Sequence, residues 1–157
     1  MKKIKLPYSK FIGNDQTPFI IAEIGNNHNG NFELALELIK KAKECGVDAV
    51  KFQVKDIESS FSKELLDRPY ENENSFGRTY REHKEALEFS KVELTKIYDY
   101  AKELEIICFS TPFDIKSVKL LENRIIGHRE SHRIVIEVIP EHAPMGKVVK
   151  DHGGIIL

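Results

Sequence analysis

Apolar segments alternate with amphipathic ones along the first 122 positions of the chain. Residues 18–25 are mostly apolar without alternation, as expected for a strand that is covered on both faces. Further strands are predicted from Val47 to Phe52 and at 106–110, where Pro112 is expected to block extension. A helical pattern follows each strand. This evenly repeated arrangement predicts an α/β fold and favours a (β/α) barrel.

The predicted helices have clear starting residues. Asn31, Ser90 and Asp114 can each accept a hydrogen bond from the first turn of a helix. The helices are expected at about 32–45, 91–104 and 115–122. The apolar stripe of the first helix is expected to comprise Leu34, Leu38, Ala42 and Cys45, with Ile39 adjacent to it. Gly46 is expected to end that helix.

The alternation of strands and helices is interrupted in three places. Residues 1–17 are a mixed lead-in, expected to form a short strand or hairpin that closes the bottom of the sheet. Residues 56–90 are polar and too long for a plain connection, and such excursions usually serve as lids or binding loops. After about residue 122 the alternation stops. We therefore divide the chain into a barrel part, 1–122, and a divergent tail, 123–157, with one or two strands.

Composition narrows the class of protein. The formal net charge is −1, so no overall field favours nucleic acid or an anionic membrane. The apolar runs fall short of the roughly 20 residues that span a bilayer, and no signal peptide follows Met1. Cys45 and Cys108 are interpreted as reduced core residues, which favours a cytoplasmic setting.

The strand ends carry the candidate chemistry. Glu23 closes the first apolar strand, where partial desolvation would suit a carboxyl group to acid–base work. Lys51 occupies the corresponding place on the second strand, and a buried lysine requires an anionic partner. A phosphate or carboxylate ligand would supply that partner. The alternative is that Glu23 and Lys51 simply form an ion pair.

Three polar residues extend this group. Gln53 is expected on the same face as Lys51, because side chains two apart in a strand share a face. Ser110 and Thr111 at the end of the third strand offer hydroxyl and backbone donors for an anion. For these two residues, a solvated turn is the alternative interpretation.

The histidines give weaker signals. His28 lies in a loop and could contact a ligand or a metal, although a lone loop histidine is more often solvated or hydrogen-bonded. Four later histidines match no compact metal-ligand spacing and are interpreted as surface residues: His128, His132, His142 and His152. Residues 25–30 match neither the Gly-x-Gly-x-x-Gly fingerprint nor the Walker pattern, so no nucleotide cofactor is indicated.

Three motifs, taken in order, resemble the N-terminal half of the sialic acid synthase family, which includes the N-acetylneuraminate, legionaminic acid and pseudaminic acid synthases. The motifs are Ala22–Gly30, Lys51–Gln53 and Phe109–Asp114. Residues 75–81 and 84–89 are similar to the extended second loop of that family. The resemblance covers about residues 15–122.

The resemblance implies a TIM-type barrel that condenses phosphoenolpyruvate with an N-acylated amino sugar of the N-acetylmannosamine type. The expected product is a nine-carbon 2-keto sugar acid, with release of phosphate. Glu23 would then be the catalytic acid–base residue. Lys51 and Thr111 would hold phosphoenolpyruvate, and Gln53 would face the sugar. A divalent metal (Mn or Mg) is expected for the full-length family, and its ligands are not expected in this chain.

The length of the chain sets a further expectation. A complete barrel of this type takes roughly 250 residues, so the 157 present here are expected to form a truncated barrel of three βα units. Open sheet edges and apolar faces favour association with another chain, for example as a homo-oligomer. A non-catalytic sugar- or phosphate-binding module and an inactive fragment are the alternatives to a synthase.

Overall fold

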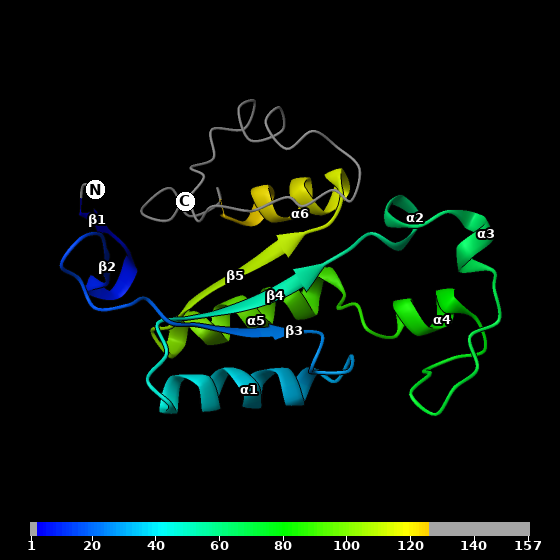
Figure 1. The fold of residues 1–157 in the computed structure, drawn as a ribbon, viewed down its shortest axis with the longest axis horizontal. Coiled ribbons are helices and arrows are strands. Elements are labelled where there is room, and N and C mark those ends of the chain that lie inside the picture. Colours follow the sequence, from blue (N-terminus) through cyan, green and yellow to red (C-terminus); the bar gives the residue numbers. More distant parts are fainter. Residues whose placement is uncertain (1–2, 126–157) are drawn as a thin grey trace.

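The computed structural model describes residues 3–125, which form a three-stranded parallel sheet with helices packed against it (Figure 1). The elements in chain order are β1 (Ile4–Lys5), a 3-10 helix (Pro7–Ser9), β2 (Phe11–Ile12), β3 (Ile21–Gly25), α1 (Phe32–Glu44), β4 (Ala49–Val54), α2 (Ile57–Ser60), α3 (Lys63–Leu66), α4 (Tyr80–Glu85), α5 (Lys91–Glu103), β5 (Ile107–Pro112) and α6 (Ile115–Ile125). The tail was predicted at 123–157. Its first three residues belong to the end of α6, and the rest lies outside the described residues. No helix in the described part is long and apolar enough to cross a membrane.

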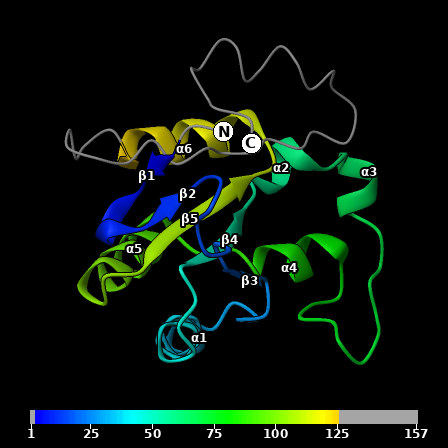
Figure 2. The same cartoon turned by 60° about the vertical axis from the view of Figure 1, so that its left-hand side comes forward.

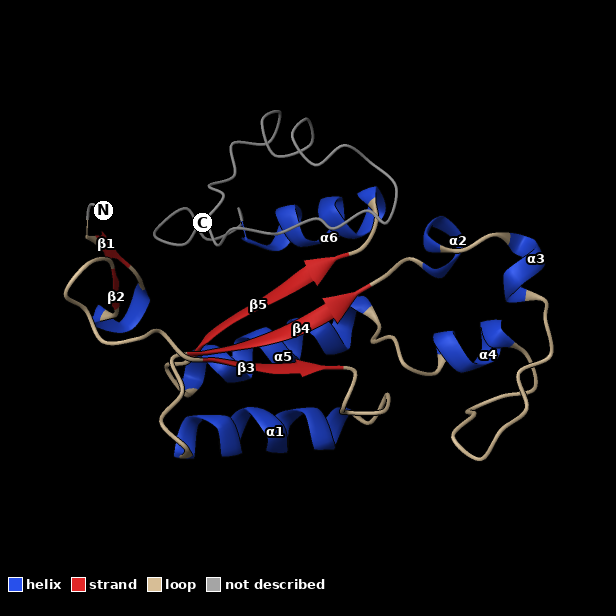
Figure 3. Cartoon of the chain, viewed as in Figure 1, coloured by secondary structure: helices blue, strands red, loops and turns tan. Residues whose placement is uncertain are grey.

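The sheet has the order β3-β4-β5, and all three strands run in the same direction (Figure 3). Glu23 pairs with Lys51, and Lys51 pairs with Phe109, so these three residues form one row across the sheet. Two residues further along each strand, Gln53 pairs with Thr111. The parallel direction confirms that the strand ends lie along one edge of the sheet.

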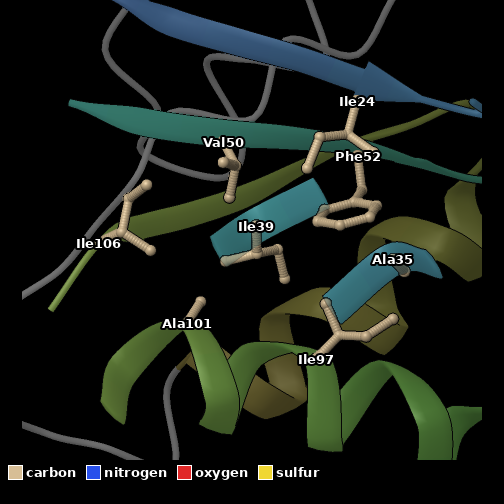
Figure 4. Close-up of a cluster of buried hydrophobic side chains, with 8 residues drawn as sticks. All are labelled: Ile24, Ala35, Ile39, Val50, Phe52, Ile97, Ala101 and Ile106. Atoms are coloured by element: carbon tan, nitrogen blue, oxygen red, sulfur yellow. The ribbon is translucent and has the colours of Figure 1, made fainter. Parts of the chain in front are cut away.

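The core lies between the sheet, α1 and α5 (Figure 4). Its buried members are Ile24, Ala35, Ile39, Val50, Phe52, Ile97, Ala101 and Ile106. Val50 and Phe52 point toward the helices, so the alternation of side chains along β4 directs Lys51 and Gln53 to the opposite face. The helix-covered face therefore supplies stability, and the other face carries the polar groups.

The predicted helix caps are confirmed. Asn31 accepts a hydrogen bond from the backbone N–H of Leu34, and Asp114 accepts one from Ser117. Ser90 and Glu93 form a reciprocal capping box at the start of α5. These contacts satisfy N–H groups that have no partner inside a helix.

Two predictions about the core are corrected by the structure. Leu38 and Ala42 of the predicted stripe pack against the core, but the fully buried residues of α1 are Ala35 and Ile39, because this line of the helix faces the sheet and α5. Cys45 is exposed, because it caps the C-terminus of α1 beyond the part covered by the strands. Cys108, by contrast, is half-buried and packs against the core.

The bounds of the later strands also differ from the prediction. Strand β5 continues through Pro112, which pairs with Val54. The proline is tolerated because Phe113 donates the hydrogen bond to the Val54 carbonyl at this rung, over 3.0 Å. Strand β4 begins at Ala49, and the Asp48 carboxylate just before it accepts hydrogen bonds from Lys10 and the backbone of Ile20.

The polar excursion at 56–90 is ordered and contains three short helices. Figures 1 and 2 show α2, α3 and α4 together, beyond the carboxyl ends of the strands. Arg81 forms ion pairs with three carboxylates of this segment: Glu58, Asp67 and Glu85. The lead-in forms the expected hairpin, since β1 and β2 pair antiparallel, at the opposite end of the sheet.

Candidate active site at the carboxyl ends of the strands

Glu23 and Lys51 are in direct contact. The Lys51 Nζ lies 2.6 Å from the Glu23 Oε1, on the face of the sheet opposite the helices. The Lys51 side chain is 24% exposed and that of Glu23 is 59% exposed. The partial desolvation predicted for Glu23 is therefore wrong for this chain, because β3 is the edge strand of the described sheet.

Gln53 and Thr111 lie one step nearer the carboxyl ends, as register partners on the same face. Thr111 is buried. The Gln53 Nε2 lies beside Gly25, 3.5 Å from the point where a Cβ on that glycine would stand. The structure thus places a carboxylate, an ammonium, an amide and a hydroxyl on one face of three neighbouring strands.

Ser110 is not part of this group. Its register partner is Phe52, which belongs to the helix-covered face, and the Tyr98 hydroxyl of α5 lies 2.7 Å from the Ser110 Oγ. Ser110 is buried there. Neighbouring residues of a strand point to opposite faces, so only one of Ser110 and Thr111 can direct its hydroxyl to the site.

Lys55 and Glu88 belong to the same edge and were missed in the sequence. The Lys55 Nζ donates to the Gln53 Oε1 over 2.9 Å, and the Lys55 backbone N–H donates to the Glu88 Oε2 over 3.1 Å. Burial lowers the pKa of Lys55 and raises the pKa of Glu88. Strand alternation, which predicts a shared face for Lys51 and Gln53, also predicts that face for Lys55. No sequence pattern distinguishes Glu88 from the other polar residues of the excursion.

His28 is a buried anchor for the loop after β3. Its Nδ1 accepts a hydrogen bond from the Gly30 backbone over 3.1 Å, and its ring centroid lies 4.2 Å from that of Phe89. Burial lowers the pKa of His28, although a hydrogen bond to the Gly25 backbone opposes the shift. Of the two alternatives left open by the sequence, the structure shows the hydrogen-bonded histidine.

A metal site is a separate question. Within residues 3–122, no three side chains among His, Cys, Asp and Glu gather as a metal would require. The divalent metal that the resemblance implies therefore stays a prediction for the full-length family.

The chain is similar to several known proteins. The NeuB family model matches residues 38–128. N-acetylneuraminate-9-phosphate synthase of Mus musculus is 40% identical over 119 residues, which are 76% of this chain and 33% of that protein. N,N'-diacetyllegionaminic acid synthase of Legionella pneumophila is 40% identical over 110 residues, 69% of this chain and 31% of that protein.

Solved structures show the same relationship. An N-acetylneuraminic acid synthetase from Leptospira borgpetersenii, crystallised with citrate, superposes with a TM-score of 0.55 at 31% identity, covering 78% of this chain and 38% of that one. Spore coat polysaccharide biosynthesis protein SpsE of Bacillus subtilis superposes with a TM-score of 0.54 at 30% identity. The match covers 79% of this chain and 31% of that one. The chain spans about a third of the length of the curated synthases that it matches. With three βα units of a TIM-type barrel and a family match over more than half of its residues, the chain belongs to the NeuB family.

Proposed function

We propose that the chain carries the phosphoenolpyruvate-binding and acid–base part of a synthase site. The reaction condenses phosphoenolpyruvate with an N-acylated amino sugar of the N-acetylmannosamine type and releases phosphate. The observation that carries the proposal is the Glu23–Lys51 ion pair on the same face as Gln53 and Thr111. The names of the relatives, which are synthases of nine-carbon acidic sugars, support the same reaction class.

Lys51 and Thr111 provide the anion-binding function. An ammonium group forms charge-assisted hydrogen bonds with phosphate or carboxylate oxygens, and a threonine hydroxyl can donate a further one. In the free protein the Lys51 charge is neutralised by Glu23. A bound anion would replace Glu23 at the ammonium and leave the carboxylate beside the ligand.

Glu23 provides the proton-transfer function. In the condensation, C3 of phosphoenolpyruvate forms a bond with the aldehyde carbon of the sugar, and one water is consumed as the C–O bond to phosphate breaks. The water adds to C2, and its oxygen becomes the keto oxygen when phosphate leaves. One proton of the water is balanced by the proton that the new hydroxyl on the sugar carbon gains, and the other leaves with the phosphate. A carboxyl group close to the bound anion can exchange these protons, and Gln53 can hold the sugar by hydrogen bonding.

A non-catalytic module that binds a sugar or a phosphate is the second candidate. The 59% exposure of the Glu23 side chain favours it, because the site does not enclose this carboxyl group. The two candidates share the contacts of Lys51 and Thr111, and they differ in whether Glu23 transfers a proton.

A phosphate-release assay separates them. The chain is mixed with phosphoenolpyruvate, N-acetylmannosamine and Mn²⁺, and compared with Glu23→Gln and with Glu37→Gln, which changes an exposed glutamate of α1. Turnover that is lost in Glu23→Gln and kept in Glu37→Gln supports the synthase. Binding of phosphoenolpyruvate without turnover supports the binding module. Absence of both binding and turnover contradicts both candidates.

A further inference from the structure

Lys55 contacts the site through Gln53. Its Nζ lies 2.9 Å from the Gln53 Oε1 and 4.2 Å from the centre of the Phe113 ring, so the ammonium is held between an amide oxygen and an aromatic face. Lys55 is half-buried at the carboxyl end of β4. It therefore lies beyond Gln53 along the chain, and it is not in the row that Glu23 and Lys51 form across the sheet.

The contact fixes which end of the Gln53 amide faces the lysine. An ammonium group has three donors and no acceptor, so it can bind only the oxygen of the amide. The nitrogen is consequently directed away from Lys55, and it lies beside Gly25 on the neighbouring strand. In the absence of such a contact, a half-turn of the terminal amide exchanges oxygen and nitrogen at little cost.

Neighbouring contacts hold Lys55 in this position. Its backbone N–H donates to the Glu88 carboxylate, and Glu88 is also the anionic group whose charge acts on the ammonium. Phe113 follows β5 directly and donates its own backbone N–H to Val54, the residue before Lys55. The ammonium is thus supported from both the excursion and β5.

We infer that Lys55 is a positioning residue that orients the Gln53 side chain so that it offers N–H donors, and not its oxygen, to the ligand. The position beside Gly25 would then select a hydrogen-bond acceptor, such as the acyl carbonyl or a hydroxyl oxygen of an amino sugar. The selection of a sugar acceptor rests on the proposed function. The orientation of the amide does not.

The amide orientation is tested directly by NMR. The side-chain NH₂ signals of Gln53, assigned by their loss in Gln53→Glu, are compared in the unchanged protein, Lys55→Met, Lys55→Arg and the control Lys63→Met on exposed α3. A cation bound to the amide oxygen strengthens the C–N double bond, so rotation of the NH₂ group should speed up in Lys55→Met alone. Equal rotation in the unchanged protein and Lys55→Met would overturn the inference.

Calorimetric titration with N-acetylmannosamine tests the consequence. This sugar is neutral, so loss of the lysine charge by itself should change its affinity little. If Lys55→Met lets both amide orientations become equally populated, affinity should fall by about twofold, because half of the molecules then present the oxygen. Lys55→Arg should restore the affinity, and adding Lys55→Met to Gln53→Ala should cause no further loss.

The outcomes separate the inference from the proposed function. A further loss in the double variant would contradict action through Gln53. If the unchanged protein binds no N-acetylmannosamine, the sugar assignment of the proposed function fails. The rotation of the Gln53 NH₂ group then still decides whether Lys55 orients the amide.

Discussion

The Glu23 carboxylate neutralises the Lys51 ammonium in the free protein, with 2.6 Å between the two charged atoms. Both groups come from register partners on neighbouring parallel strands, so the contact follows directly from the pairing of β3 with β4. An anionic ligand must compete with Glu23 for the same ammonium. The ion pair therefore governs access to Lys51.

Glu23→Gln should tighten the binding of phosphoenolpyruvate. The substitution removes both the competitor for Lys51 and a negative charge beside the bound anion. Because the pair is partly exposed, the gain corresponds to at most about 1 kcal/mol, or roughly fivefold in the dissociation constant. Isothermal titration calorimetry measures the change, with Glu37→Gln as a control that should leave affinity unaltered. Weaker binding in Glu23→Gln would show that the carboxylate helps to hold the ligand.

Acidification should destabilise the protein through His28. Burial lowers the pKa of this histidine, so the unfolded chain takes up a proton more readily than the folded one. Stability is then complete above the ordinary histidine pKa of about 6.5 and is lost as the pH falls through the lower folded value. His83 shifts in the same direction for the same reason. NMR titration of both rings and urea unfolding between pH 5 and 7 check this prediction, and a pKa above the ordinary value at His28 would contradict it.

Glu88→Gln should leave the protein at least as stable at neutral pH. Burial raises the pKa of this carboxyl, so the folded state holds its proton more tightly than the unfolded chain. The stability contributed by Glu88 therefore falls as the pH rises above the ordinary glutamate value. Glutamine keeps an oxygen that can accept the N–H of Lys55, and it removes the titration.

Glu88→Leu is the matched comparison for that substitution. It removes the titration as well, but it leaves the Lys55 N–H without its acceptor, at a cost of about 1–3 kcal/mol. Urea unfolding at pH 5 and pH 7 compares the three proteins. A Glu88→Gln variant that is less stable than the unchanged protein at pH 7 would refute the expected sign.

Gly30→Ala should destabilise the protein far more than Gly46→Ala. Both glycines have positive φ, at +72° and +80°, so alanine at either position meets a backbone cost of about 1–2 kcal/mol. A Cβ at Gly30 would also lie 1.9 Å from the Ala86 carbonyl oxygen, whereas nothing lies within 4 Å of one at Gly46. Urea unfolding should separate the two variants, and equal losses would show that the loop after β3 does not pack on residues 86–87.

Much of this arrangement could be predicted because it depends on local patterns. The helix caps, the parallel strands and the position of Gln53 follow from side-chain spacing and strand alternation alone. The Glu23–Lys51 contact also followed, since equivalent residues of neighbouring parallel strands face the same side. Strand alternation also predicts that the side chains of Ser110 and Thr111 point to opposite faces of the sheet. It could therefore have shown that Ser110 does not share the face of Thr111.

Other features depend on contacts between distant parts of the chain. Glu88 reaches Lys55 from 33 positions away, and Asp114 accepts the backbone N–H of Asp56 across 58 positions. The burial of His28 depends on Phe89, which lies in the excursion. Spacing within a segment carries no information about such pairs, so the sequence indicated an open polar loop where the structure has short helices tied to the site.

Calorimetric titration of phosphoenolpyruvate into the unchanged protein and Lys51→Met tests the central claim most directly. Loss of one charge-assisted hydrogen bond to a bound anion should weaken affinity roughly tenfold to a hundredfold. Lys63→Met, which changes a lysine of α3, should leave affinity unaltered. The same affinity in the unchanged protein and Lys51→Met would contradict the account, because the anion would then be held by groups other than the Lys51 ammonium.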